Sequence, residues 1–240
     1  YPAADADGGA AQPGSGGAGG GSGGSAGASG AAGSADSGAC QPGKVAWVEN
    51  FGLAFDDEFT ALAGYGTDVL ASGTHRGNSS LGKHLLPNEG LDDLFVAKLD
   101  SQGGALWAKP FGSPGVETIA DLAVDGTGNV VVTGTFAHAS LNLGAGPLAF
   151  DAVTDVFVAK LAGVDGATLW ARGVPGAGEQ IARAITVNAN GDVFIGFDHS
   201  EQMNIDGIGL SADIDDIAVV KLGGSNATRV WAVSFGDDKA

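Results

Sequence analysis

Two histidines, His75 and His199, occupy matching positions in a repeated sequence pattern, each at the end of a segment that reads as a β-strand. Imidazoles at matched positions could converge on a metal ion, but metal ligation needs further histidine or carboxylate ligands at fixed short spacing. The middle copy carries Phe136 at this position, His138 lies two residues away, and His84 lies in a variable loop. We therefore expect His75 and His199 to be exposed residues at strand ends, and we assign no metal site.

Three acidic stretches could supply oxygen ligands for calcium: Asp56-Asp57-Glu58, Asp125–Asn129 and Asp213-Ile214-Asp215-Asp216. A calcium site needs six to eight oxygen ligands, and the EF-hand loop sets the standard for recognising one. The stretch Asp125–Asn129 lacks the third acidic ligand and the terminal glutamate of that loop. We expect these residues to shape hairpin turns and predict no cofactor, with weak calcium binding as the alternative.

Motifs of nucleophilic or phosphate chemistry are missing from the sequence. It contains no GxSxG, no GxxxxGK[ST] and no HExxH, and the single cysteine, Cys40, has no histidine nearby. Pairs of carboxylates of the glycosidase type depend on their separation in space, which a sequence does not give. We assign no catalytic residue and expect a non-enzymatic protein.

The feature that must position all these residues is an internal repeat. Tryptophans stand at 47, 107, 170 and 231, so their spacings are 60, 63 and 61 residues. A matching segment precedes the last three: DLFVAKL from Asp93, DVFVAKL from Asp155 and DIAVVKL from Asp216. A fixed period of this size indicates stacked copies of one supersecondary unit.

Each copy reads as four β-strands, and no segment has the 3.6-residue apolar period of a helix. In the middle copy TIADLAVD and NVVVTGTF flank a glycine-rich turn, which is typical of a hairpin. VFVAKL and TLWA form a second pair. Matched apolar residues between the two pairs predict a small extra hairpin or a packed loop: Leu81, Leu143, Ile205, Leu86, Leu148 and Leu210.

A β-propeller blade is a sheet of four strands, and each repeat of about sixty residues also provides four strands. We therefore predict an all-β fold of such blades, a partial propeller. The repeated tryptophan is expected to lie between neighbouring sheets. The repeated Asp and Lys are expected to form a salt bridge or hydrogen bond that caps the corner of each blade. Repeats start near Trp47, Trp107 and Trp170, with a partial repeat at Trp231 and so a tryptophan strand at each end.

Composition divides the chain into two regions and limits its partners. Residues 1–43 are rich in Gly, Ala and Ser and predict a disordered tether before the repeat region at 44–240. The formal net charge is −17 and the isoelectric point is near 4.2, which disfavours binding to nucleic acid or to anionic membrane surfaces. No apolar run approaches the roughly 18 residues of a membrane span.

The middle copy, FGSPGVETIADLAVDGTGNVVVTGTF followed by DVFVAKL, resembles the bacterial SBBP-type β-propeller repeat. The resemblance covers residues 44–236, and the third copy departs from it at Val174-Pro175 and Gly196-Phe197. DSQGGALW is similar, more weakly, to quinoprotein-type propeller repeats. The SBBP resemblance implies an exported or surface-attached bacterial protein without known chemistry, located outside the cell, in the periplasm or on the outer surface. A lipoprotein anchor would suit the tether, but Cys40 follows thirty-nine small and polar residues and is not such an anchor.

We therefore expect a binding or scaffold module whose partner, an unknown protein or glycan, meets a loop face. The loops that differ most between copies are His75–Leu91, Ala137–Phe150 and Asp198–Ser211. Alternatives are a propeller lyase or hydrolase with its catalytic blade elsewhere, and a purely structural spacer. Propellers usually close with four to eight blades, so we expect the ring to be completed by further blades of a longer chain or by self-association.

Overall fold

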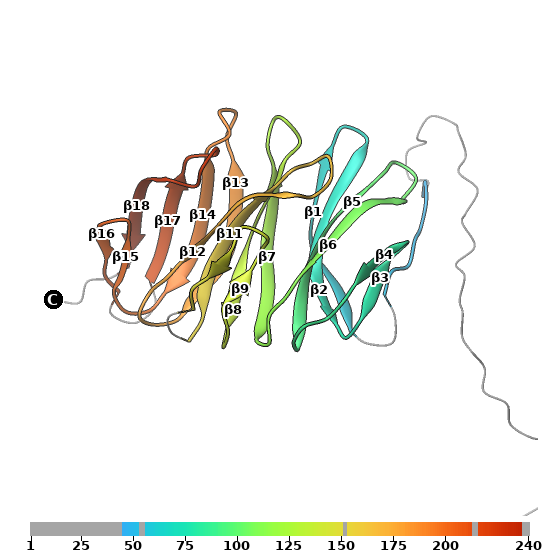
Figure 1. Cartoon of the computed structure of the whole chain (residues 1–240). Coiled ribbons are helices and arrows are strands. Elements are labelled where there is room, and N and C mark those ends of the chain that lie inside the picture. Colours follow the sequence, from blue (N-terminus) through green and yellow to red (C-terminus); the bar gives the residue numbers. More distant parts are fainter. Residues whose placement is uncertain (1–44, 53–55, 151–152, 213–215, 237–240) are drawn as a thin grey trace, which may run out of the picture. The chain divides into compact units, whose positions relative to one another are not determined.

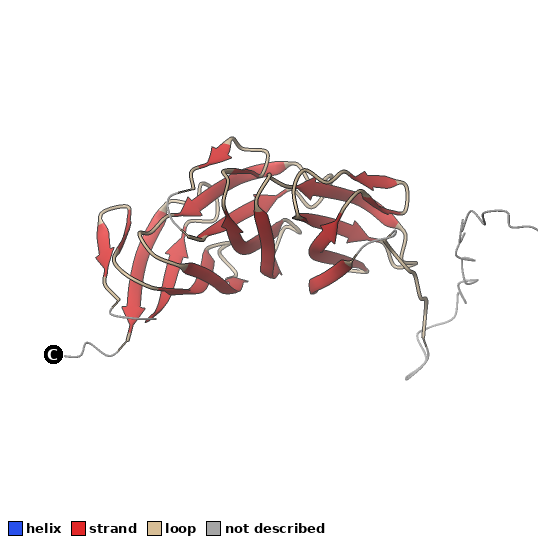
Figure 2. Ribbon diagram, turned by 90° about the horizontal axis from the view of Figure 1, so that it is seen from below, coloured by secondary structure: helices blue, strands red, loops and turns tan. Residues whose placement is uncertain are grey.

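Every regular element among the described residues is a β-strand, which confirms the all-β fold class (Figure 1 and Figure 2). The computed structural model of the chain describes residues 45–52, 56–150, 153–212 and 216–236. These residues all belong to the unit Ala32–Ala240. The predicted tether with Cys40 lies outside the described residues, as do Asp213 and Asp215.

Twelve of the described strands form three four-stranded antiparallel sheets, in which strands that follow one another pair side by side. The first sheet contains β1 (Asp57–Tyr65), β2 (Asp68–Arg76), β5 (Asp92–Leu99) and β6 (Ala105–Phe111). The second contains β7 (Val116–Val124), β8 (Val130–Ala137), β11 (Asp155–Leu161) and β12 (Thr168–Val174). The third contains β13 (Gln180–Val187), β14 (Val193–His199), β17 (Asp216–Leu222) and β18 (Arg229–Phe235).

A two-stranded ribbon joins the second and third strands of every sheet, so the predicted extra hairpins are present. The ribbons are β3 (Ser79–Leu81) with β4 (His84–Leu86), β9 (Leu141–Asn142) with β10 (Pro147–Leu148), and β15 (Met203–Ile205) with β16 (Ile208–Leu210). The matched residues Leu81, Leu143 and Ile205 are all buried. Burial of these side chains is what holds such short ribbons against the sheets, because an isolated two-stranded hairpin is marginally stable.

The sheets do not begin at the tryptophans, where the repeats were predicted to start. Trp107 lies on β6, Trp170 on β12 and Trp231 on β18, so each sheet ends with its tryptophan strand. Trp231 therefore belongs to the third sheet. The strand expected at Trp47 is not formed, since residues 45–52 belong to no strand.

Neighbouring sheets pack against each other through β7, which contacts β1 and β2, and through β13, which contacts β7 and β8. Trp107 is part of the apolar core that joins the first two sheets, and Trp170 is part of the core that joins the second and third. They are only 5% and 8% exposed. The expectation that tryptophan lies between sheets is confirmed for both.

Each of these tryptophans also shares a hydrogen-bond acceptor with a lysine. Trp107 Nε1 and Lys98 Nζ donate to the carbonyl oxygen of Gly163 in the second sheet, at 3.2 and 3.3 Å. A Cβ atom on Gly163 would lie 1.8 Å from a backbone oxygen of the adjacent hairpin turn, so only glycine allows the close approach.

The same arrangement joins the second and third sheets. Trp170 Nε1 and Lys160 Nζ donate to the carbonyl oxygen of Gly224, at 3.1 and 3.0 Å. A Cβ atom on Gly224 would again lie 1.8 Å from a backbone oxygen of the neighbouring turn. We call each set of two donors and one carbonyl a Lys–Trp junction.

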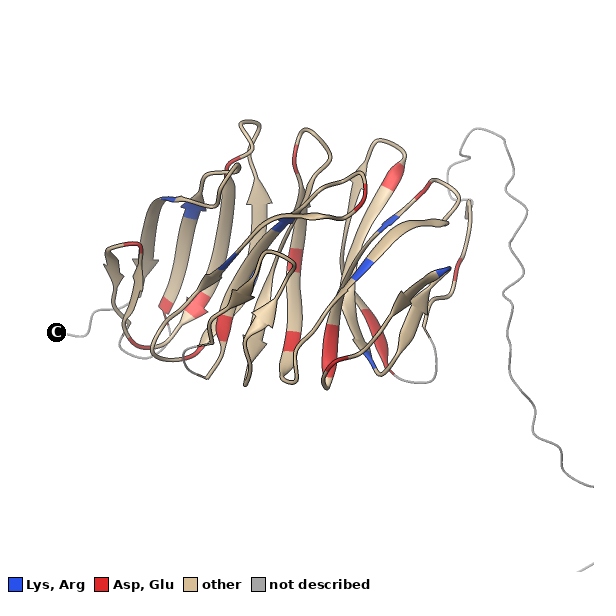
Figure 3. Cartoon of the chain, viewed as in Figure 1, with Lys and Arg blue, Asp and Glu red and all other residues tan. Residues whose placement is uncertain are grey.

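The repeated lysines form the predicted salt bridges, but with a different set of aspartates. Lys98, Lys160 and Lys221 contact carboxylates of the hairpin turns at 3.0, 2.8 and 2.8 Å; these are Asp68, Asp125 and Asp192. The aspartates of the repeated segment (Asp93, Asp155 and Asp216) lie five residues away on the same strand, about 16 Å at strand spacing. Figure 3 shows acidic residues at both ends of the sheets, and the lysines pair with those of the hairpin turns.

Candidate functional site

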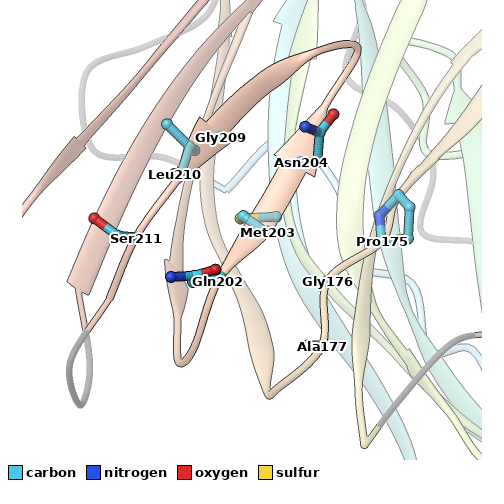
Figure 4. Close-up of a pocket in the computed structure, with 9 residues that line it drawn as sticks. All are labelled: Pro175, Gly176, Ala177, Gln202, Met203, Asn204, Gly209, Leu210 and Ser211. Carbon is cyan, nitrogen blue, oxygen red and sulfur yellow. The ribbon is translucent and has the colours of Figure 1, made fainter.

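A groove of about 670 Å³ lies beside the third ribbon, within the loop Asp198–Ser211 that was expected to meet a partner (Figure 4). Its lining comes from the linker before β13 and from the ribbon: Pro175, Gly176, Ala177, Gln202, Met203, Asn204, Gly209, Leu210 and Ser211. Volumes of about 300–1,000 Å³ are typical of ligand sites.

Strand β15 places the side chains of the groove by simple alternation. Met203 and Ile205 point inward and are buried, whereas Gln202 and Asn204 are exposed. An isolated antiparallel bridge between Gly176 and Met203 brings the linker alongside β15. Figure 4 shows β15 with the linker on one side and β16 on the other.

The linker approaches the ribbon in the segment where the third repeat departs from the pattern of the first two. Val174-Pro175 replaces Phe-Gly, and Gly176 stands where the second repeat has Ser113. A Cβ atom on Gly176 would lie 2.5 Å from Gln180 Nε2 and 3.2 Å from Met203 Cβ. The segment that departs from the repeat thus has a glycine at the point where the linker meets the ribbon. The groove residues in the linker could have been suspected only from that departure.

The groove is chemically neutral. Gln202 and Asn204 carry amides, Ser211 carries a hydroxyl, and the buried Met203 and Leu210 supply apolar surface. Asn204 Oδ1 accepts a hydrogen bond from the backbone N–H of the ribbon turn at 2.7 Å, which fixes the orientation of the amide. Such a lining can form hydrogen bonds and apolar contacts with a neutral polar ligand.

The expectation of exposed histidines at strand ends is wrong. His75 and His199 are each 1% exposed, because each lies on the second strand of a sheet, paired on both sides. His75 Nδ1 contacts the carbonyl oxygen of Gly77 at 3.0 Å, and His199 Nε2 contacts Ser234 Oγ at 2.8 Å. The two lie in the first and third sheets and have separate partners.

The other two histidines take part in local structure. His84 Nε2 lies 3.2 Å from the carbonyl oxygen of Ala105, which ties the first ribbon to β6. His138 has a positive φ of 70° in the turn after β8. Among the described residues, no group of three or more His, Cys, Asp and Glu side chains is arranged to hold a metal ion.

The oxygens of Asp125, considered above for calcium, are occupied by donors of the protein. Asp125 Oδ1 accepts from the N–H of Thr127, the hydroxyl of Thr127 and the N–H of Asn129, at 2.8, 2.7 and 3.0 Å. Oδ2 contacts Lys160 Nζ at 2.8 Å and the Asn129 amide at 3.1 Å. Burial opposes ionisation, but these donors, Lys160 first, outweigh it and lower the pKa of Asp125 well below its ordinary value.

Two carboxyl groups are buried although the sequence analysis did not predict it. Glu117, at the start of β7, is 0% exposed and is contacted by the N–H of Ser113 at 3.3 Å and by the Ser113 hydroxyl. Burial raises the pKa of Glu117 to about 7, and the nearby Asp93 adds to this. Burial also raises the pKa of Asp93, which is 0% exposed. Asp93 begins the repeated segment and Glu117 lies in the stretch that carries the SBBP resemblance, but neither pattern predicts that the carboxyl is buried.

Comparison with known proteins does not assign the chain to a family: no family model matches the sequence, and no curated protein matches it. In the described part of the chain, no helix has the length and apolar character needed to cross a membrane.

Proposed function

We propose that the repeat region forms part of a β-propeller and acts as a non-enzymatic binding or scaffold module of an exported or surface-attached protein. Three features support the propeller: the four-stranded sheets, the pairing of strands in chain order and the Lys–Trp junctions between successive sheets. The export is carried over from the SBBP resemblance.

The observation that carries the binding function is the groove beside the third ribbon. It combines about 670 Å³ of volume with exposed amides and a hydroxyl over apolar side chains. Its ligand is a neutral polar segment of a protein or a glycan, since both present hydroxyl or amide groups without charge. A net charge of −17 further favours partners that are not acidic.

Binding to arrays of neutral glycans and of extended peptides tests this function. The double variant Gln202→Ala with Asn204→Ala should abolish binding to whichever array captures the wild-type chain. Asn142 is the matched control, because it occupies the same place in the second ribbon as Asn204 and likewise accepts a turn N–H, at 2.9 Å. Asn142→Ala should bind as the wild type does. Capture that survives in the double variant would refute the groove as the site.

A further inference from the structure

The third sheet carries the donors of a Lys–Trp junction on a face that no described sheet covers. Lys221 pairs with Trp231 across β17 and β18, in the register that Lys98 has with Trp107 and Lys160 with Trp170. Trp231 is 37% exposed, whereas Trp107 and Trp170 are 5% and 8% exposed. The third junction therefore has both donors in register and lacks its carbonyl within the described residues.

The rest of this face is apolar. Trp231, Val233 and Phe235 alternate along β18 and so lie on one side of the strand; we call them the β18 face. Val233 and Phe235 are 39% and 55% exposed, while Val174, which matches Phe235 in the second sheet, is 1% exposed. Exposed apolar residues gathered on one face mark an interaction surface.

The first sheet has the surface that matches this face. Gly103 in the β5–β6 turn corresponds to Gly166 in the β11–β12 turn, and both have positive φ angles, 84° and 71°. The ring of Trp107 packs on Gly166, 2.8 Å from the position of a Cβ atom. The ring of Trp47 packs on Gly103 in the same way, at 2.7 Å.

Trp47 therefore takes the place that the tryptophan of a preceding sheet would take. It comes from residues 45–52, which form no strand, and in which Val45 and Val48 are 76% and 72% exposed. Trp47 and Phe51 pack against the core of the first sheet. A short segment thus covers a surface that a whole sheet covers in the second and third repeats.

We infer that two copies of this chain associate head to tail, with the β18 face of one copy on the first sheet of the other. Trp231 displaces the partner's Trp47 from Gly103 and packs there as Trp107 packs on Gly166. This inference goes beyond the proposed binding function and does not depend on it.

The contact is heterologous, because different surfaces of the two copies meet, so it forms a closed ring if the rotation between copies closes and a filament otherwise. Each copy carries a net charge of −17, which opposes association at low ionic strength. Added salt screens this repulsion, so association should strengthen as salt rises.

Sedimentation equilibrium of the 240-residue chain tests the inference. The average mass should rise from 23.5 kDa toward at least twice that value as concentration increases through the micromolar range. Trp231→Ala and Phe235→Lys should each weaken association at least about tenfold, since both alter the β18 face and the position of Phe235 is apolar in every repeat, as Phe111 and Val174. Trp47→Ala should strengthen association, since this substitution removes the ring that covers Gly103.

Val230→Ala is the matched control. Val230 is on the same strand and 52% exposed, but its position is exposed in all three repeats, with Leu106 at 47% and Leu169 at 52%. This variant should associate as the wild type does, and circular dichroism should show all variants folded. A wild-type chain that stays at 23.5 kDa at all concentrations and salt levels would overturn the inference. So would unchanged association of both β18-face variants, or weaker association of Trp47→Ala.

Discussion

The buried carboxyl of Glu117 makes the stability of the fold depend on pH, and the substitution Glu117→Gln tests this. Glu117 is 0% exposed, and burial is the main cause that raises its pKa from 4.5 to about 7. In the third repeat the same position holds Gln180, which is also buried and is neutral at every pH. The fold of the repeat therefore accommodates an uncharged side chain at this position. Glu117 is uncharged, as Gln180 is, only when its carboxyl is protonated.

The sign of the effect follows from the raised pKa. Between the two pKa values the folded chain holds a proton that the unfolded chain has released, so stability is complete below the ordinary pKa and falls as the pH rises through about 7. One pKa unit corresponds to about 1.4 kcal/mol, so the rise from 4.5 to about 7 amounts to about 3 kcal/mol in total. About 2 kcal/mol of this is lost between about pH 5.5 and about pH 8.5.

Urea unfolding of both chains at these two pH values measures the effect. The free energy of unfolding of the wild type should fall by about 2 kcal/mol more than that of Glu117→Gln. Glu179→Gln is the control, because Glu179 is exposed and its loss changes the net charge equally. If the wild type and Glu117→Gln show parallel pH dependence, Glu117 ionises normally and the reasoning from burial is refuted.

Three further predictions concern the junctions between sheets, each measured as the free energy of unfolding in urea. Trp170→Phe keeps most of the buried ring but removes the Nε1 donor to the Gly224 carbonyl, so it should cost about 1 kcal/mol. Gly224→Ala places a Cβ atom 1.8 Å from a backbone oxygen and should destabilise the chain, while Gly209→Ala, with nothing within 4 Å, should not. Lys160→Met leaves the buried Asp125 carboxylate without its cation and should cost about 3 kcal/mol at neutral pH. Because the pKa of Asp125 is lowered on folding, its contribution is present above its ordinary pKa, and the difference between variant and wild type should shrink on acidification.

Much of the fold could be predicted because the repeat records it three times. The tryptophan column located one strand of each sheet, although that strand ends the sheet and does not begin it as predicted. A large apolar ring at one fixed place per repeat has few other uses than packing between units. The ribbons were foreseen from matched apolar residues such as Leu81 and Ile205, which are buried as the pattern required.

The partners of the repeated lysines could not be foreseen, because pairing across strands depends on register. Lys98 and Asp93 recur together in sequence, yet strand geometry carries them to opposite ends of β5. The burial of His75 and His199 was missed for a related reason. A residue at the end of one strand is covered when the neighbouring strands extend as far as it does. Here β5 extends far enough for Asp93 to pair directly with His75.

The groove was predicted only as a region, since its shape depends on how a linker meets a ribbon. The loop Asp198–Ser211 was marked by its difference from the other copies, but the bridge from Gly176 to Met203 joins it to a segment some twenty-five residues away. Contacts of this kind are set by backbone approach, which a glycine permits without specifying its partner.

The hairpin turns show that the repeat preserves an interaction more strictly than a residue. In the second sheet Asp125 opens the turn and Asn129 closes it, whereas in the third sheet Asn188 opens the turn and Asp192 closes it. In both, one carboxylate oxygen receives a lysine at 2.8 Å and an asparagine amide at 3.1 Å. Between the two turns the carboxylate and the amide exchange sequence positions, but in both turns the lysine pairs with the carboxylate. The lysine of the third sheet is therefore held in the same way as the lysine that donates to Gly224, although its own acceptor is not among the described residues. Because Lys221 is held as Lys160 is, the β18 face has the geometry of a sheet that packs against a further sheet.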